Sequence, residues 1–217
     1  MNKETQIFLI RHGSVDNPDD ISYGRLPIPL SKKGREELLS LAGVLKSHSI
    51  KFDHLYTSPL VRAKQTAQII GDELGVESVE VREELNDVDI GELQGAPMQI
   101  LKDANYNEEK LKEMGFEIET KGEIVRRIRR LISQVVQEHR GENVAMVSHG
   151  DVTRLGLWSQ EFGEKRPPGN LRDNDYLAVA EAVVLKFDGD RYINHEFIRR
   201  EKSGQVEKDH IKRTEAY

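Results

Sequence analysis

Two segments of this chain share a short pattern, in which an apolar run leads to a histidine and then a glycine. The first copy is Ile7-Phe8-Leu9-Ile10-Arg11-His12-Gly13, and the second is Val144-Ala145-Met146-Val147-Ser148-His149-Gly150. Such runs predict buried strands, and the glycine marks a sharp exit from each strand. Ligands bind beside the carboxyl ends of strands in an open α/β sheet. Two imidazoles at that edge, one of them next to an arginine, indicate a site that handles phosphate.

The first pattern joins a nucleophile to an anion-binding group. A neutral imidazole can attack phosphorus and hold the phosphoryl group covalently, provided that a hydrogen bond to its other nitrogen fixes the tautomer. The planar guanidinium of Arg11 matches the oxygens of a phosphate. An isolated Arg-His-Gly tripeptide is more often an ion-paired arginine beside a packed histidine, so His12 needs support from other residues.

Two more groups are expected at the same sheet edge. Arg62 follows the strand-to-helix segment Tyr56-Thr57-Ser58-Pro59-Leu60-Val61 and lies in the first helical turn, where the helix dipole adds positive potential. The imidazole of His149 could donate a hydrogen bond to the transferring phosphoryl oxygens. An exposed helical arginine and a packed histidine are the alternatives, and spacing alone does not separate them.

The elements around these motifs alternate between strand and helix. Helices are expected from about Ser31, from Ser58-Pro59 to Leu74, over 122–139 and from about Asp151, and further strands over 54–57, 79–81, 182–187 and 192–198. Residues 83–95 read as loop, residues 97–116 as weakly helical, and the charged tail 199–217 as a solvated helix or frayed end. The alternation predicts one domain over 1–217, a three-layer α/β/α sandwich with a mostly parallel central sheet.

The composition narrows the possible partners. Of the 217 residues, 37% are hydrophobic and 32% charged, and the net charge is -6. This acidic balance disfavours nucleic acids and anionic membranes. No apolar run is long enough for a membrane span, and the polar start leaves no room for a secretory signal. We therefore expect a cytoplasmic protein acting on a small phosphorylated substrate, without nucleic-acid or membrane partners, and leave monomer and homodimer open.

The residue types also limit the chemistry. The chain has no cysteine, which excludes disulfides, thiolate metal sites and cysteine nucleophiles. No group of histidines and aspartates shows metal-ligand spacing, so we expect no metal and no other cofactor.

Taken together, the motifs resemble those of the histidine phosphatase superfamily, the phosphoglycerate-mutase-like proteins. The resemblance spans about residues 5–198 and includes five segments in the family's order: Arg11-His12-Gly13, Pro29-Leu30-Ser31-x-x-Gly34, Ser58-Pro59-x-x-Arg62-Ala63, Gly91-Glu92-Leu93-Gln94-Gly95 and Ser148-His149-Gly150. Five ordered segments outweigh the packing interpretation of each residue alone. The resemblance implies a phosphoglycerate-mutase-like fold.

The resemblance also implies roles for the polar residues of these segments. His12 would carry the phosphoryl group, and Arg11, Arg62 and His149 would surround it, with Gly150 beside them. Many relatives continue the first segment with Glu-Thr-x-x-Asn, whereas this chain reads Ser14-Val15-Asp16-Asn17-Pro18. Asn17, one position early, is a further candidate for binding the phosphate.

The proton donor is less clearly marked. In the family it is usually a glutamate within Leu-x-Glu-x-x-x-Gly, and the matching segment here is Leu85-Asn86-Asp87-Val88-Asp89-Ile90-Gly91. Asp87 falls at that position with a side chain one methylene shorter. A donor must hold a proton near the working pH, which burial or nearby negative charge favours. Asp151 is the second candidate for this role, and Asp89 is the third.

The expected function is hydrolysis of a phosphomonoester, without a metal, through a phosphohistidine on His12. A phosphoglycerate-type phosphomutase is the alternative, although mutases of the family usually carry a longer insertion where residues 96–121 of this chain are short and polar. A binding module that recognises phosphate without turnover would require both Asp87 and Asp151 to be misplaced. Substrate choice is expected to depend on the loops 14–29, 96–121 and 167–175. The acidic residues Asp16, Asp19 and Asp20 form either an ordinary solvated loop or a filter against highly charged substrates.

Overall fold

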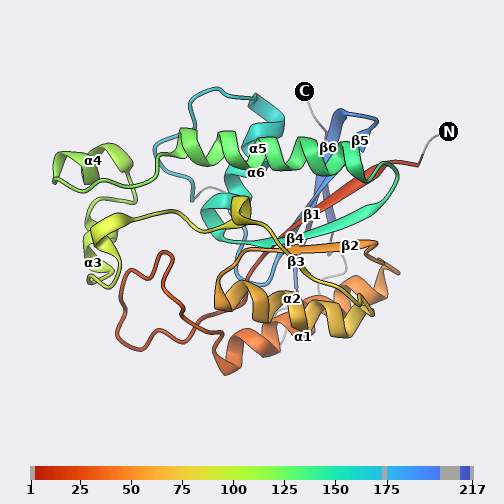
Figure 1. The fold of residues 1–217 in the computed structure, drawn as a ribbon, viewed down its shortest axis with the longest axis horizontal. Coiled ribbons are helices and arrows are strands. Elements are labelled where there is room, and N and C mark those ends of the chain that lie inside the picture. Colours follow the sequence, from red (N-terminus) through yellow and green to blue (C-terminus); the bar gives the residue numbers. More distant parts are fainter. Residues whose placement is uncertain (1–2, 173–174, 201–210, 216–217) are drawn as a thin grey trace.

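The computed structural model describes residues 3–172, 175–200 and 211–215, and within them seven strands form one sheet (Figure 1). The strand order is β3-β2-β4-β1-β5-β6-β7. The parallel half consists of β1 (Thr5–Arg11), β2 (His54–Thr57), β3 (Glu80–Val81) and β4 (Asn143–Ser148). The antiparallel half adds β5 (Ala182–Asp188), β6 (Arg191–Ile198) and β7 (Ile211–Glu215). The α/β class is confirmed, and the C-terminal pairings make the sheet more mixed than we expected.

Helices cover both faces of this sheet. In Figure 1, α1 (Lys32–Ser47) and α2 (Val61–Leu74) lie on one face, and α5 (Lys121–Glu138) and α6 (Gly150–Phe162) lie on the other. Alternate residues of β1 point to opposite faces: Ile7 and Leu9 join the core under α5 and α6, whereas Phe8 and Ile10 join the core under α1 and α2. A strand buried on both faces reads as a continuous apolar run. The predicted three layers are therefore present.

The shorter helices stand to one side of the sheet. They are α3 (Gln99–Asp103) and α4 (Glu108–Glu113), preceded by the 3-10 turns η1 (Glu83–Leu85) and η2 (Gly91–Leu93) within the predicted loop (Figure 1). Leu93, Ala104 and Leu111 bury a small apolar cluster of their own. None of the helices in the described part of the chain is long and apolar enough to cross a bilayer.

Two expected elements differ in the structure. Helix α2 begins at Val61 rather than at Ser58-Pro59 because Ser58 still pairs with the sheet, its amide donating to the carbonyl of Val147 at 3.0 Å. Residues 211–215 of the predicted solvated tail form β7, which pairs with β6. The free edge of β6 offers backbone donors and acceptors that an added strand satisfies. Residues 201–210 lie outside the described residues.

The carboxyl edge of the parallel half brings three motifs side by side. The amide of His12 donates to Ser148 at 3.1 Å, just as Ser58 donates to Val147, so the pairing continues one residue past the strands. His12, Ser58 and His149 therefore leave β1, β2 and β4 at one edge, as expected for parallel strands.

The backbone after His12 packs directly against the start of α1. Ser31 caps this helix by accepting from the amide of Gly34 at 3.0 Å, and its hydroxyl donates to the carbonyl of Ser14 at 3.1 Å. A Cβ added at Gly34 would lie 2.0 Å from that Ser14 oxygen. Only glycine allows this approach, which fixes the exit of the chain from β1.

Candidate active site

A cavity of about 330 Å³ opens at the carboxyl edge of the sheet. Its lining includes Arg11, His12, Asp87, Gly150 and Asp151 from the predicted motifs. Arg62 and His149 are absent from the lining and lie behind Asp87, 2.7 and 3.4 Å from its Oδ2. Each of the three loops expected to set specificity also contributes, since the lining includes Asp20, Tyr23, Gly24, Met98, Leu101, Lys102, Tyr106 and Arg172. The polar groups converge in one concave site, which is typical of small-molecule binding.

His12 is held as a neutral nucleophile. Its side chain is buried, and Nδ1 lies 2.7 Å from the carbonyl oxygen of Gly13. A carbonyl only accepts, so Nδ1 carries the proton and Nε2 keeps its lone pair. Burial lowers the pKa of His12 well below its usual value, and the nearby His149 imidazole and the guanidiniums of Arg62 and Arg11 lower it further.

Arg62 is the most deeply buried charge of the site. It is fully buried, and its guanidinium donates to the carbonyl of Leu26 at 3.1 Å and to that of Gly24 at 2.6 Å. Its Nη2 also donates to Oδ2 of Asp87 at 2.7 Å. The Tyr23 ring lies 4.8 Å from the guanidinium carbon. The loop 14–29 therefore folds over Arg62 and holds it with main-chain oxygens.

Arg11, the last residue of β1, is held by the segment that precedes β5. Its Nη1 donates to the carbonyl of Leu177 at 2.6 Å, and its guanidinium lies 5.1 Å from the centre of the Tyr176 ring. Among the described residues, the buried Nε atoms of Arg11 and Arg62 have no hydrogen-bond partner. Buried donors without partners are rare in folded proteins, so these atoms are available to an anion.

His149 offers a second available donor. Its Nε2 lies 2.9 Å from Oγ of Ser58, which itself accepts from the amide of Leu60 at 3.4 Å. We assign the Ser58 hydroxyl as the donor to Nε2 of His149. The proton of the His149 ring is then on Nδ1. That nitrogen is buried, makes no hydrogen bond within the described residues and lies 3.4 Å from Oδ2 of Asp87. Burial, followed by the charge of Arg62, lowers the pKa of His149 well below its usual value.

Asp87 stands where these groups meet. Its Oδ1 accepts from the amide of Val88 at 2.9 Å, while Oδ2 accepts from Arg62. The main chain at Asp87 is held by Arg25, whose Nε donates to its carbonyl at 3.0 Å. Ser148 ties the same segment to β4 through a 2.7 Å hydrogen bond from Oγ to the carbonyl of Leu85. The serine of the Ser-His-Gly segment thus positions the loop that carries the acid.

The remaining candidate residues lie differently. Asp151, in the first turn of α6, lines the cavity and accepts from the Tyr176 hydroxyl at 2.7 Å. Asp89 is absent from the cavity lining and pairs with Arg25 at 3.1 Å. Asn17 is also absent from the lining, because its amide bonds to both the carbonyl and the amide of Ile21. The structure therefore brings Asp151 to the cavity and leaves Asp89 and Asn17 outside it.

Sequence reasoning missed the tyrosines of the site. Tyr23 and Tyr176 cover the two guanidiniums, and burial raises the pKa of both hydroxyls. A Cβ at Gly150 would lie 2.3 Å from the Tyr176 hydroxyl and 2.9 Å from the guanidinium carbon of Arg11. A side chain at position 150 would therefore displace Tyr176 and Arg11 from these positions. The only available signals were Tyr23 within the loop 14–29 and Tyr176 directly after the loop 167–175.

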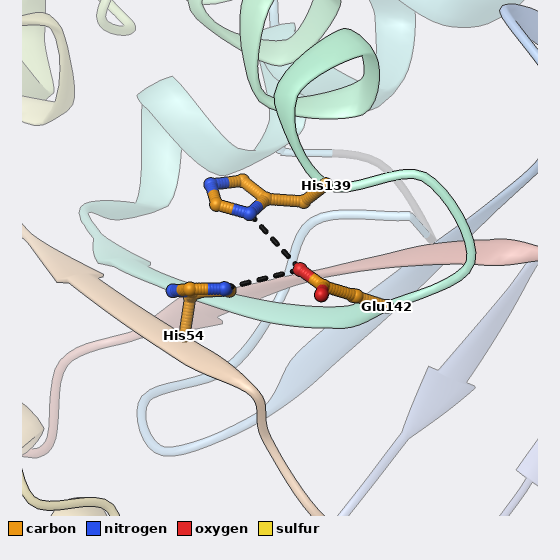
Figure 2. Close-up of side chains that lie close together, drawn as sticks. All are labelled: His54, His139 and Glu142. Carbon is orange, nitrogen blue, oxygen red and sulfur yellow. Dashed lines mark hydrogen bonds and ion pairs between the residues drawn. The ribbon is translucent and has the colours of Figure 1, made fainter.

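A second cluster of ionisable side chains lies away from the cavity. His54, His139 and Glu142 bring one ligand atom each to within 4.8 Å of one another (Figure 2). The expectation from the sequence covered only histidines and aspartates at metal-ligand spacing along the chain, so it did not include this group of two histidines and a glutamate. The two histidines are 85 positions apart in the chain, and they meet because His54 begins β2 beside β4 while His139 ends α5 shortly before β4.

The match to a family model decides what kind of protein this is. Residues 7–197 match the histidine phosphatase superfamily (branch 1). The chain belongs to this superfamily. It is similar to phosphoglycerate mutase-like protein 4 of Arabidopsis thaliana, with 27% identity over 86% of this chain and 82% of the relative. It is also similar to the uncharacterized phosphatase PhoE of Bacillus subtilis, with 31% identity over 67% of this chain and 72% of that protein.

Solved structures agree with this placement. A mycobacterial glucosyl-3-phosphoglycerate phosphatase complexed with VO3 superimposes with a TM-score of 0.67 and 25% identity, covering 83% of this chain and 92% of the other. YhfR of Bacillus stearothermophilus shares the fold, with a TM-score of 0.71 and 22% identity over 87% of this chain and 94% of its own. Relatives named as phosphatases and as mutases place this chain among enzymes of phosphoryl transfer.

The buried neutral histidines predict that acid destabilises the protein. The pKa values of His12 and His149 are lowered in the folded protein. Below about pH 6.5, these histidines therefore bind protons in the unfolded chain but not in the folded one. Each such histidine then removes up to about 1.4 kcal/mol of stability per pH unit. His149→Gln should remove one of these contributions. Urea unfolding between about pH 7.5 and about pH 5, in buffer without phosphate, should show a shallower pH dependence for this variant.

The matched control is His48→Gln, because His48 is exposed at the end of α1. It should keep the slope of the wild-type protein. If His149→Gln kept that slope as well, the unfolded and folded states would bind the same number of protons at this position, against the interpretation.

Proposed function

We propose that this chain is a phosphatase that hydrolyses a phosphomonoester through a phosphohistidine on Nε2 of His12. One observation carries the proposal: the proton of His12 is held on Nδ1 by Gly13, so the nucleophilic nitrogen is free in an imidazole that burial keeps neutral. Such a fixed tautomer is what nucleophilic catalysis by histidine requires. Arg11, Arg62 and Nδ1 of His149 would stabilise the negative charge of the transferring phosphoryl group, so no metal is required.

The first step forms the phosphoenzyme. Nε2 of His12 attacks phosphorus in line with the leaving oxygen, the bond to that oxygen breaks, and Asp87 gives its proton to the departing alcohol. An incoming phosphoryl group competes with Asp87 for Arg62, which in the structure donates to Oδ2 at 2.7 Å. Exchange of that ion pair for the phosphate would free the carboxyl to turn toward the leaving oxygen.

The second step returns the enzyme to its starting state. A water molecule attacks phosphorus, the bond between phosphorus and Nε2 of His12 breaks, and the carboxylate of Asp87 takes a proton from the water. The products are inorganic phosphate and a free imidazole. Asp87 would thus act as the general acid in the first step and as the general base in the second. General acid–base catalysis typically raises a reaction rate by about 10²–10⁴-fold.

Access to water favours hydrolysis over transfer to a second substrate. The segment 96–121 folds only into α3 and α4, of 5 and 6 residues. The cavity mouth is lined by the exposed side chains of Asp20, Lys102 and Arg172. Water can reach the site past these polar groups, which supports water as the acceptor of the phosphoryl group.

The rim of the cavity suggests a substrate with a second anionic group. The Arg172 guanidinium lies 3.5 Å from the centre of the Tyr106 ring, and Lys102 pairs with Asp20 at 2.8 Å. A planar guanidinium stacked on an aromatic ring is well placed to bind a carboxylate. The solved mycobacterial relative is named for glucosyl-3-phosphoglycerate, and phosphoglycerates carry a carboxylate near the phosphate. We infer that the substrate is a phosphorylated hydroxy acid or a derivative of one.

His12→Ala should abolish turnover and phosphoenzyme formation. We expect hydrolysis of p-nitrophenyl phosphate in the presence of EDTA to fall by at least about a thousandfold. Radiolabelled substrate and rapid quenching should label the wild-type protein with an acid-labile, alkali-stable phosphate and leave the variant unlabelled. Wild-type turnover by the variant would rule out this nucleophile. Conversion of 3- to 2-phosphoglycerate by the wild-type protein with little phosphate release would favour the mutase.

Asp87→Asn should slow the reaction in a way that depends on the leaving group. For an alkyl phosphomonoester, whose alkoxide needs a proton, we expect kcat to fall by about 10²–10⁴-fold. With p-nitrophenyl phosphate the first step needs little protonation, so the loss should be much smaller. Asp89→Asn, outside the cavity, should show no such difference between the substrates. If Asp151→Asn showed the difference in place of Asp87→Asn, the proton donor would be Asp151.

Arg172→Gln should weaken binding of substrates with a second negative charge. We expect KM for 3-phosphoglycerate to rise about tenfold, the size of one charge-assisted hydrogen bond, with kcat little changed. Glycerol 3-phosphate lacks the carboxylate and should be unaffected. Arg166→Gln is the control, because Arg166 is exposed and is absent from the cavity lining. Equal changes for both substrates would show that Arg172 does not recognise the carboxylate.

A further inference from the structure

The cluster of His54, His139 and Glu142 lies at the amino edge of the sheet. His54 is the first residue of β2, Glu142 precedes β4, and His139 ends α5. Figure 2 shows both imidazoles turned toward the same carboxylate. Nε2 of His54 and Nδ1 of His139 each lie 3.0 Å from Oε2 of Glu142. The catalytic residues leave β2 and β4 at the other end of these strands, so this cluster is separate from the cavity.

We propose that these three side chains bind a divalent transition-metal ion, with Zn²⁺ as the best match. Two imidazole nitrogens and one carboxylate oxygen form a common ligand set for zinc in proteins. Tetrahedral bonds of about 2.0–2.1 Å place ligand atoms about 3.3–3.4 Å apart. The two nitrogen-to-oxygen distances of 3.0 Å are close to that spacing, and all three atoms lie within 4.8 Å. Small side-chain shifts would therefore admit an ion.

The surroundings of His139 favour this role. Its Nε2 lies 2.8 Å from the hydroxyl of Tyr56, a buried residue of β2. Ligand histidines usually have a hydrogen-bonding partner at the second ring nitrogen, and that partner fixes the ring orientation. With the metal on Nδ1, the ring proton would move to Nε2 and be donated to Tyr56. The ring is therefore already turned so that Nδ1 faces the other two ligands.

The cluster is reachable from solvent. The side chains of His54 and Glu142 are 36% and 41% exposed, whereas that of His139 is 14% exposed. An ion can enter on the side of His54 and Glu142, and water can complete its coordination. Three protein ligands with one open position distinguish this arrangement from a closed structural zinc site.

The expected effect of the metal is on stability. Residues 142 and 149 stand at opposite ends of β4, and at about 3.3 Å per residue the strand separates them by roughly 20 Å. An ion at Glu142 would join the starts of β2 and β4 to the end of α5 without touching the phosphoryl group. A ligand that binds only the folded state stabilises it by mass action.

Zinc titration of the metal-free protein by calorimetry tests the proposal. We expect one ion per chain bound by these ligands, with affinity falling at least about tenfold in His54→Gln and in Glu142→Gln. Tyr56→Phe should reduce affinity by about 10–100-fold, because it removes the partner that orients His139. Zinc should also raise the Tm of the wild-type protein by several degrees, and at the same zinc concentration it should raise that of the two ligand variants by less. Circular dichroism establishes that each variant is folded.

Two control variants separate this site from others. His48→Gln removes an exposed histidine elsewhere and should bind zinc as the wild-type protein does. His12→Ala addresses the imidazoles of the cavity, which could also attract zinc, and should likewise retain the ion. Binding that survives His54→Gln and Glu142→Gln but disappears in His12→Ala would place the ion in the cavity and overturn the proposal. So would the absence of binding tighter than about 100 μM, a value at which association is worth about 5.5 kcal/mol.

Discussion

The site depends on positive charge held inside the protein beside imidazoles that stay neutral. Arg62 is fully buried, and burial of an unpaired charge is costly. Arg11, Arg62 and Arg172 bring three positive charges and Asp87 and Asp151 two negative charges, which leaves one positive charge in excess. This excess favours the binding of a phosphate anion.

Main-chain oxygens hold this charge in place. Gly24 and Leu26 accept from Arg62, and Leu177 accepts from Arg11. All three carbonyls belong to irregular loops rather than to a helix or a strand. Because these contacts occupy only part of each guanidinium, the Nε atoms stay available to an anion. The loops therefore fix the orientation of the arginines before any substrate arrives.

Much of this arrangement could be predicted from the sequence because parallel strands end at a common edge. The apolar runs before His12 and His149 located β1 and β4, and the order of the motifs indicated that Arg62 would join them. The direction of a side chain within a loop has no such rule. Asn17 has the right residue type, yet its amide forms a local turn with Ile21.

Contacts between segments that lie far apart in the sequence could not be predicted either. Tyr23 and Tyr176 cover the arginines because two irregular loops converge, and neither loop has a periodic pattern. The pairing of residues 211–215 with β6 depends on a free sheet edge rather than on the charged composition of the tail. The group of His54, His139 and Glu142 likewise follows from the register of β2 against β4, since His54 pairs with Val144, two residues beyond Glu142.

The side chains at the two edges of the parallel strands therefore differ in the charges that surround them. At the carboxyl edge, the neutral imidazoles must face guanidiniums, so burial and nearby positive charge keep protons away from them. At the amino edge, the imidazoles of His54 and His139 face the carboxylate of Glu142, and these three side chains turn nitrogen and oxygen ligand atoms toward one another. The charge next to each pair of imidazoles, and not the histidine residue itself, determines what the pair can bind. The two proposals thus place an anion at the carboxyl edge and a cation at the amino edge, and the strands keep these sites apart.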